Sequence, residues 1–129
     1  MGNPFGYSDV LMDHFDRPRN AGELTSPDAV GTCRGHGGDC TTFYLRVRAG
    51  VIREITFQCV GCPPAIAAAS ITTELAKNRR IPAAATISAD DITAALDGLP
   101  DEKRHVAVVT ANALAEAINL YTRRGARPV

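Results

Sequence analysis

The amino-acid sequence contains no tryptophan, and only three tyrosines and four phenylalanines occur among its 129 residues. Sites that stack nucleic-acid bases or sugars need several aromatic side chains on one surface, so this class of binding protein is not indicated. Charge of either sign is not in excess, since 14 Lys and Arg residues balance 14 Asp and Glu residues. A general affinity for nucleic acid or for anionic membranes is therefore not expected.

Long hydrophobic runs are missing as well. No apolar segment approaches the length that spans a bilayer, and residues 1–6 lack the basic flank and apolar core of a secretory signal. The glycine-rich stretch 35–39 matches neither the G-x-G-x-x-G pattern nor the lysine-containing P-loop of nucleotide-binding proteins. We expect a cytoplasmic protein without a membrane segment, in which residues 1–129 form a single domain.

Four cysteines are present, namely Cys33, Cys40, Cys59 and Cys62. Disulfides are rare in the cytoplasm, so four thiols in such a chain favour metal or redox chemistry over a disulfide framework.

The stretch from Cys59 to Ser70 marks a change from strand to helix. A β-branched and aromatic run predicts a strand over 51–57, and Gly61 followed by Pro63 and small residues predicts the start of a helix. Cys62 then lies near a helix N-terminus, where unpaired N–H groups and the helix dipole favour a thiolate, which is both a nucleophile and a metal ligand. The alternative is that the two cysteines are small apolar residues filling a core. Their position on either side of a glycine at this corner favours a ligand pair.

The remaining pattern predicts an α+β domain. Helices are expected over about 9–15, 64–78, 89–96 and 101–124, and strands over 29–32, 41–47 and 51–57. The predicted architecture is a three-stranded, mainly antiparallel sheet flanked by helices. The long C-terminal helix carries an apolar stripe that covers the sheet.

A predicted hairpin brings the cysteines together. Ala49 and Gly50 form the turn between the second and third strands, so the start of one strand lies beside the end of the other. The glycine-rich loop before Cys40 therefore meets the corner at Cys62. This topology predicts that all four cysteines converge with Asp39.

Six separated strings carry a family resemblance. They are Tyr7–Phe15, Arg17–Gly22 with its Pro-Arg-Asn-x-Gly pattern, Val30–Thr32, Gly38–Asp39, Gly61–Ser70 and Ala115–Tyr121. In this order, over nearly the whole chain, they resemble the iron–sulfur cluster scaffold family typified by IscU and the N-terminal domain of NifU.

The resemblance implies a set of ligands. Members of the family hold a nascent [2Fe–2S] cluster, or sometimes zinc, through three cysteines with an aspartate or histidine nearby. Position by position, Cys62 matches the second family cysteine, Asp39 the aspartate and His105 the histidine. The first and third family cysteines fall on Gly37 and Val106, neither of which can bind a metal.

Two interpretations of this departure stay open: either the site has been rebuilt from other cysteines, or cluster assembly has been lost. Four thiols match the Cys₄ set that an iron–sulfur cluster or structural zinc needs, which favours the rebuilt site. Its predicted ligands are Cys59 and Cys62 at the corner, Cys33 and Cys40 from the loop, and Asp39 as a labile ligand that eases release. His105 is either a further ligand or a surface imidazole at the start of a helix.

We therefore expect an iron–sulfur cluster scaffold or carrier, and not an enzyme. The resemblance implies iron or a nascent [2Fe–2S] cluster as cargo, a cysteine desulfurase as sulfur donor and apoproteins as recipients. The ligands come from one chain or from two copies in a homo-oligomer. One alternative is a permanent Cys-ligated zinc domain that serves as a protein-interaction module. Another is a dithiol redox protein that uses Cys59 and Cys62.

The segment 99–103 departs from the family in a second way. Family members bind a dedicated Hsp70-type chaperone through a Leu-Pro-Pro-Val-Lys segment, and this chain has Leu-Pro-Asp-Glu-Lys in its place. Asp101 and Glu102 stand where the family segment has apolar Pro and Val, so we expect no binding of that chaperone.

Overall fold

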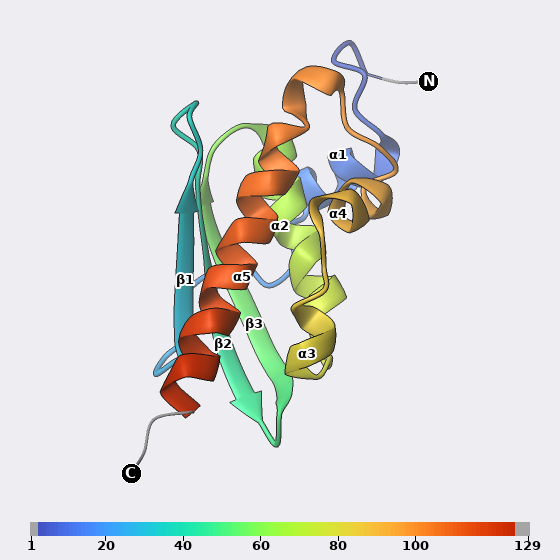
Figure 1. Ribbon diagram of the computed structural model, residues 1–129. Helices are drawn as coiled ribbons and strands as arrows, with labels where there is room; N and C mark the ends of the chain where they lie inside the picture. The colour runs from blue at the N-terminus through green and yellow to red at the C-terminus, as the bar shows by residue number, and fades with distance from the viewer. Residues whose placement is uncertain (1–2, 126–129) are drawn as a thin grey trace.

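A three-stranded antiparallel sheet forms the centre of the molecule (Figure 1). The computed structural model describes residues 3–125. The strands are β1 (Ala29–Arg34), β2 (Cys40–Arg48) and β3 (Val51–Val60), and they lie in the order β1-β2-β3. The α+β class and the antiparallel sheet predicted from the sequence are thus confirmed.

The β2–β3 hairpin turns at Ala49 and Gly50. Their φ angles of 53° and 76° lie in the left-handed region that a two-residue hairpin turn requires. The register pairs Arg48 with Val51 at the turn and Cys40 with Val60 at the far end, with one irregularity between Arg46 and Val47. The predicted hairpin is therefore present, and it runs to the cysteine end of the sheet.

The described residues form five α-helices and one 3₁₀ turn in addition to the sheet. They are α1 (Asp9–Asp16), α2 (Pro63–Ala76), α3 (Ile81–Ala84), α4 (Ala89–Ala95), η1 (Asp101–Lys103) and α5 (His105–Gly125). The side chains of Ser8 and Ser88 cap α1 and α4 by accepting hydrogen bonds from backbone N–H groups of the first turn. The last helix begins at His105 and not at 101, because the residues after Pro100 form the 3₁₀ turn first.

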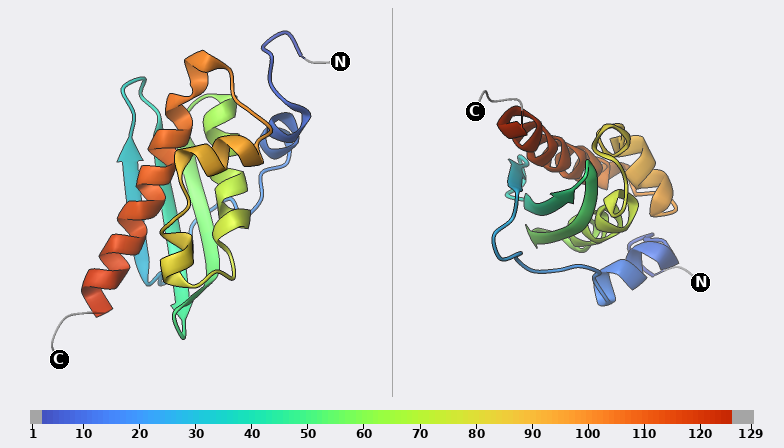
Figure 2. Two further views of the ribbon diagram at one scale, coloured as in Figure 1. Left: turned by 45° about the vertical axis from the view of Figure 1, so that its right-hand side comes forward. Right: turned by 90° about the horizontal axis from the view of Figure 1, so that it is seen from below.

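Helices α2 and α5 cover one face of the sheet, as the view from below shows (Figure 2). Side chains alternate along β2, so Thr41, Phe43 and Leu45 are buried under these helices. The approach of α5 to β1 is close: a Cβ atom added at Gly31 would lie 2.2 Å from the backbone nitrogen of Ala117. The core lies between the sheet and the two long helices.

The segment after α1 closes the edge of β3. Phe57 donates its N–H to the carbonyl of Asn20 and accepts a hydrogen bond from the N–H of Gly22. Apart from this contact the stretch 19–28 is irregular, as its turn-rich sequence predicts. None of the helices in residues 3–125 combines the length and the apolar character needed to cross a membrane.

Candidate metal centre

Four stretches meet at the end of the sheet opposite the β2–β3 turn (Figure 1). They are the end of β1 with loop 35–39, the start of β2, the end of β3 with the corner 61–62 before α2, and the start of α5. Each predicted site residue lies on one of these stretches. The hairpin topology therefore predicted correctly which end of the molecule carries them.

The cysteines of this end do not all face the same way. Cys33 and Cys40 lie within β1 and β2, not in the loop as predicted, and Cys59 lies within β3. The register places Cys33 opposite Thr41, and Thr41 opposite Cys59, on the face that the helices cover. Cys40 is one residue earlier than Thr41 and so belongs to the other face.

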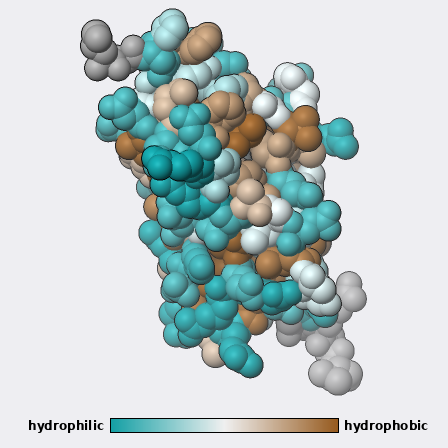
Figure 3. Space-filling view, turned by 180° about the vertical axis from the view of Figure 1, so that it is seen from behind, coloured by the Kyte–Doolittle hydropathy of each residue, from teal (hydrophilic) through white to brown (hydrophobic). Residues whose placement is uncertain are grey.

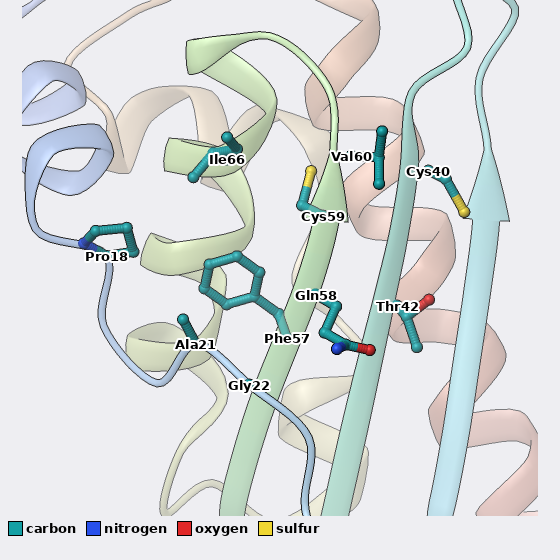
Figure 4. A pocket seen from close by; sticks show the side chains of 10 residues that line it. All are labelled: Pro18, Ala21, Gly22, Cys40, Thr42, Phe57, Gln58, Cys59, Val60 and Ile66. Atoms are coloured by element: carbon teal, nitrogen blue, oxygen red, sulfur yellow. The ribbon is translucent and has the colours of Figure 1, made fainter.

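Three adjoining hollows contain the predicted site residues. The corner hollow, of about 580 Å³, is lined by Asp39, Cys62, Lys103 and His105 together with Gly37, Gly38, Val60 and Gly61. The edge hollow, of about 660 Å³, is lined by Cys59 of β3, residues 18–22, Ile66 of α2 and, on β2, Cys40. Figure 4 shows the sulfur of Cys40 pointing away from Cys59. The loop hollow, of about 690 Å³, contains Cys33, His36 and His105 between loop 35–39 and α5.

Asp39 is the most buried ionisable group of the corner hollow, with 8% of its surface exposed. Its Oδ2 atom accepts no hydrogen bond and lies 3.6 Å from Nε2 of His105, whose side chain is half exposed. Its Oδ1 atom lies against the corner, 3.3 Å from the position that a Cβ atom at Gly61 would take. A buried carboxylate oxygen without a hydrogen bond is unfavourable, and a bound cation is one arrangement that satisfies it.

Cys62 is the N-cap of α2, as the corner sequence predicts. Fewer free backbone N–H groups are present here than at most helix starts. Prolines occupy the first two helical positions, and proline has no backbone N–H. The next N–H group, that of Ala65, donates to the carbonyl of Cys62 itself. The Cys62 thiol is half-buried and shares the corner hollow with the Lys103 side chain.

Burial raises the pKa of the Cys59 thiol above its usual value. The Thr41 hydroxyl, 3.5 Å from the sulfur, acts in the opposite direction, while the nearby groups of Asp39, Cys62 and Cys40 raise the pKa further. Cys59 is protonated at neutral pH, so a metal bound by its sulfur would displace a proton.

No three His, Cys, Asp or Glu side chains of residues 3–125 lie close enough together to hold a metal ion. The four cysteines are free thiols, each half-buried. Cys33 lines the loop hollow, apart from Cys59 in the edge hollow and Cys62 in the corner hollow. The assignment of individual ligands therefore stays a prediction. A complete Cys₄ set would need the start of β2 to rearrange, because Cys40 is on the opposite face of the sheet from Cys33 and Cys59.

Two residues of this site were not predicted from the sequence. Lys103 lines the corner hollow beside Cys62, and Thr41 contacts the sulfur of Cys59. A lysine beside two acids gives no signal of its own. Thr41 could have been found only from the strand register, which pairs it with Cys59.

The positions of the two missing family cysteines differ in their surroundings. Val106, in the first turn of α5, is buried, with 1% of its surface exposed. Gly37 is exposed in the loop, and a Cβ atom added there would meet no atom within 4 Å. A thiol at position 37 would therefore fit without any change in the backbone.

Comparison with known proteins gives consistent matches. A family model described as "NifU-like N terminal domain" matches residues 6–128. An iron–sulfur cluster assembly scaffold protein, IscU 1 of Archaeoglobus fulgidus, is 42% identical over 122 residues, which is 94% of this chain and 80% of that protein. The scaffold protein IscU of Azotobacter vinelandii is 35% identical over 123 residues, covering 92% of this chain and 95% of that protein.

Solved structures share the fold. The N-terminal NifU-like protein of Brucella abortus matches with a TM-score of 0.77 at 18% identity, over 91% of this chain and 94% of that one. A putative iron–sulfur cluster assembly scaffold from Fervidobacterium islandicum matches with a TM-score of 0.75 at 17% identity, over 87% and 96% of the two chains. At these identities the likeness concerns the arrangement of helices and strands.

Proposed function

This chain belongs to the family of NifU-like N-terminal domains, and on that basis we propose that it is a scaffold on which an iron–sulfur cluster is assembled. The cluster, with [2Fe–2S] as the expected form, is cargo and not a resident cofactor. Its sulfur would come from a cysteine desulfurase, and apoproteins would receive it. The chain itself supplies ligands and catalyses no reaction.

The observation that carries this proposal is the orphaned Oδ2 atom of Asp39 in the corner hollow. The atom is buried, accepts no hydrogen bond, and shares its hollow with the Cys62 thiol and the His105 imidazole. A carboxylate, a thiol and an imidazole are all donors that iron accepts. The hollow is open to solvent on the side of loop 35–39, where Gly37 and Gly38 are exposed, so cargo could enter and leave.

We assign the ligand roles in order of position. Asp39, Cys62 and His105 form the first set, because they line one hollow, and binding would draw the three side chains closer together than they lie in the structure. Cys59 and Cys40 are the next thiols, since both line the adjoining edge hollow, from opposite faces of the sheet. Cys33 is the last candidate, because it lies within β1 and lines the separate loop hollow. Asp39 is the weakest of these ligands for iron and the natural one to leave when the cluster is released.

The test is an anaerobic reconstitution with ferrous iron, cysteine and a cysteine desulfurase, followed by assays of iron, zinc and acid-labile sulfide and by visible absorption spectroscopy. We expect iron and sulfide in equal amounts with sulfur-to-iron charge-transfer bands. Stoichiometric zinc that neither iron nor sulfide displaces would instead support a permanent zinc domain and refute cluster assembly.

Variants assign the ligands. Cys62→Ser should abolish cluster formation, whereas Cys33→Ser should retain most of it, because Cys33 lies in a different hollow. Gly37→Cys places a thiol at an unobstructed position of the corner hollow and should increase the cluster yield. Full cluster in Cys62→Ser, or complete loss in Cys33→Ser, would contradict this order of ligands.

A further inference from the structure

The end of the molecule opposite the corner hollow carries an excess of positive charge. Its cations come from the β2–β3 hairpin and from the chain that follows α2: Arg46, Arg48, Arg53, Lys77, Arg79 and Arg80. We call these residues the basic end. Three carboxylates lie near them, those of Asp28 and Glu54 in a shared hollow and that of Asp91 near Arg79. Positive charge therefore exceeds negative charge locally, although the whole chain is neutral.

Backbone hydrogen bonds hold the two parts of the basic end together. The N–H of Ile52 donates to the carbonyl of Arg79 at 2.9 Å, and the N–H of Asn78 donates to the carbonyl of Ile52 at 2.7 Å. Val51 pairs with Arg48 on one side and with Arg80 on the other. The cations of the hairpin and of the chain after α2 are thus arranged on one rigid platform.

Most of these cations have no partner within residues 3–125. Arg46 forms an ion pair with Glu54 at 2.8 Å, but the other five make no salt bridge within 4 Å, and all five are exposed. The C-terminus of α2 presents the equivalent of only about half a negative charge. The helix dipole therefore accounts for a small part of the positive charge gathered here.

We propose that the basic end is a docking surface for an acidic segment of a partner protein. A cationic surface speeds and orients association with an acidic one. A protein partner fits better than a nucleic acid, because the chain has zero net charge and no aromatic side chain belongs to the basic end. Seen from behind, the lower part of the molecule has a mostly hydrophilic surface (Figure 3).

Docking there would leave the corner hollow free. Strand β3 begins at the basic end and finishes at the corner, and its ten residues span roughly 30 Å. A partner bound at the basic end could therefore hold the protein while its other end exchanges cargo. This inference does not depend on the cluster chemistry, so the two can fail separately.

The experiment measures fluorescence anisotropy of a labelled twelve-residue oligoglutamate peptide titrated with the full chain at low ionic strength. We expect saturable binding that weakens with added salt. The double variant Arg48→Glu/Arg80→Glu should bind at least about tenfold more weakly. The matched control Arg17→Glu/Arg104→Glu changes the net charge equally, at two exposed arginines outside the basic end, and should stay within about twofold of the parent.

Circular dichroism of both double variants checks that they are folded. Cys62→Ser should bind the peptide as the parent does, which separates docking from cluster assembly. Equal losses in the two double variants, absence of saturable binding, or tighter binding of a twelve-nucleotide single-stranded RNA than of oligoglutamate would each overturn the proposal.

Discussion

His14 is a buried imidazole that joins α1 to α2. Its Nδ1 atom lies 2.7 Å from the Ser70 hydroxyl oxygen. That oxygen accepts a hydrogen bond from the backbone N–H of Arg19, so the hydroxyl can donate its own proton to Nδ1 of His14. The Nε2 atom lies 3.4 Å from a carboxylate oxygen of Glu74. Burial lowers the pKa of His14, and the positive charge of Arg19 lowers it further against the opposing effect of Glu74.

This lowered pKa predicts a loss of stability in mild acid. The unfolded chain takes up a proton near the usual pKa of 6.5, whereas the folded state resists it, so the unfolded state binds more protons. The contribution of His14 to the free energy of unfolding should be level above about pH 7.5, fall as the pH drops through about 6.5, and level off again below the folded pKa. Denaturant titrations at a series of pH values over this range measure the free energy of unfolding.

A matched pair of variants isolates the histidine. His14→Asn removes the titrating group from α1 and should flatten the pH dependence, while His36→Asn, at an exposed loop position, should leave the slope as in the parent. A slope that persists unchanged in His14→Asn would show that other groups cause it.

The contact between β1 and α5 depends on one glycine. At Gly31 a methyl group would lie 2.6 Å from the carbonyl oxygen of Ala113 and 2.2 Å from the nitrogen of Ala117, and backbone cannot move aside cheaply. Gly31→Ala should therefore lower the free energy of unfolding by about 3 kcal/mol or more, through forced separation of the strand from the helix.

Urea denaturation compares this variant with Gly37→Ala. A methyl group at Gly37 meets no atom within 4 Å, so the same chemical change there should alter the free energy of unfolding by less than about 0.5 kcal/mol. Similar effects of the two substitutions would mean that α5 does not lie as close to β1 as described.

The types of most elements followed from local signals in the sequence. Ser8 and Ser88 marked two helix starts, and Ala49 with Gly50 marked the hairpin turn, because caps and turns are made by neighbouring residues. Strand ends were less predictable. β1 and β3 continue through Cys33 and Cys59, because pairing with β2 extends a strand beyond what its own composition indicates.

The candidate site was predictable in location but not in detail. Hairpin topology placed Cys40 and Cys62 at one end of the sheet. The face to which a strand cysteine points depends on the strand register, and a shift of the register by one residue moves the side chain to the other face. The burial of Asp39 beside Gly61 depends on the path of a glycine-rich loop. Such loops have no sequence pattern that fixes their path.

At the scale of the molecule, the two ends of the sheet should respond differently to cargo. The hydrogen bond from the N–H of Gly35 to the carbonyl of Asp39, 2.8 Å long, closes loop 35–39, and a metal bound at Asp39 would hold that loop. Anaerobic ferrous iron should slow amide hydrogen exchange at 35–39 and at the corner 61–62. At short labelling times the amides of Ile52 and Asn78, at the other end, should be unchanged.

Mass spectrometry of the exchanged peptides measures both ends in one experiment, and Cys62→Ser with iron serves as the control that should show no slowing. Equal slowing at the two ends would indicate a general stabilisation of the fold and not a local site.

The close approach at Gly31 also has a consequence for synthesis. Its partners, Ala113 and Ala117, leave the ribosome long after the β2–β3 hairpin, whose strands adjoin in sequence and can pair early. Until α5 emerges, the apolar face of the sheet near β1 has no helix over it. The nascent chain is therefore expected to carry a half-covered sheet, a natural target for chaperones that shield apolar surface, until its last helix seals the core.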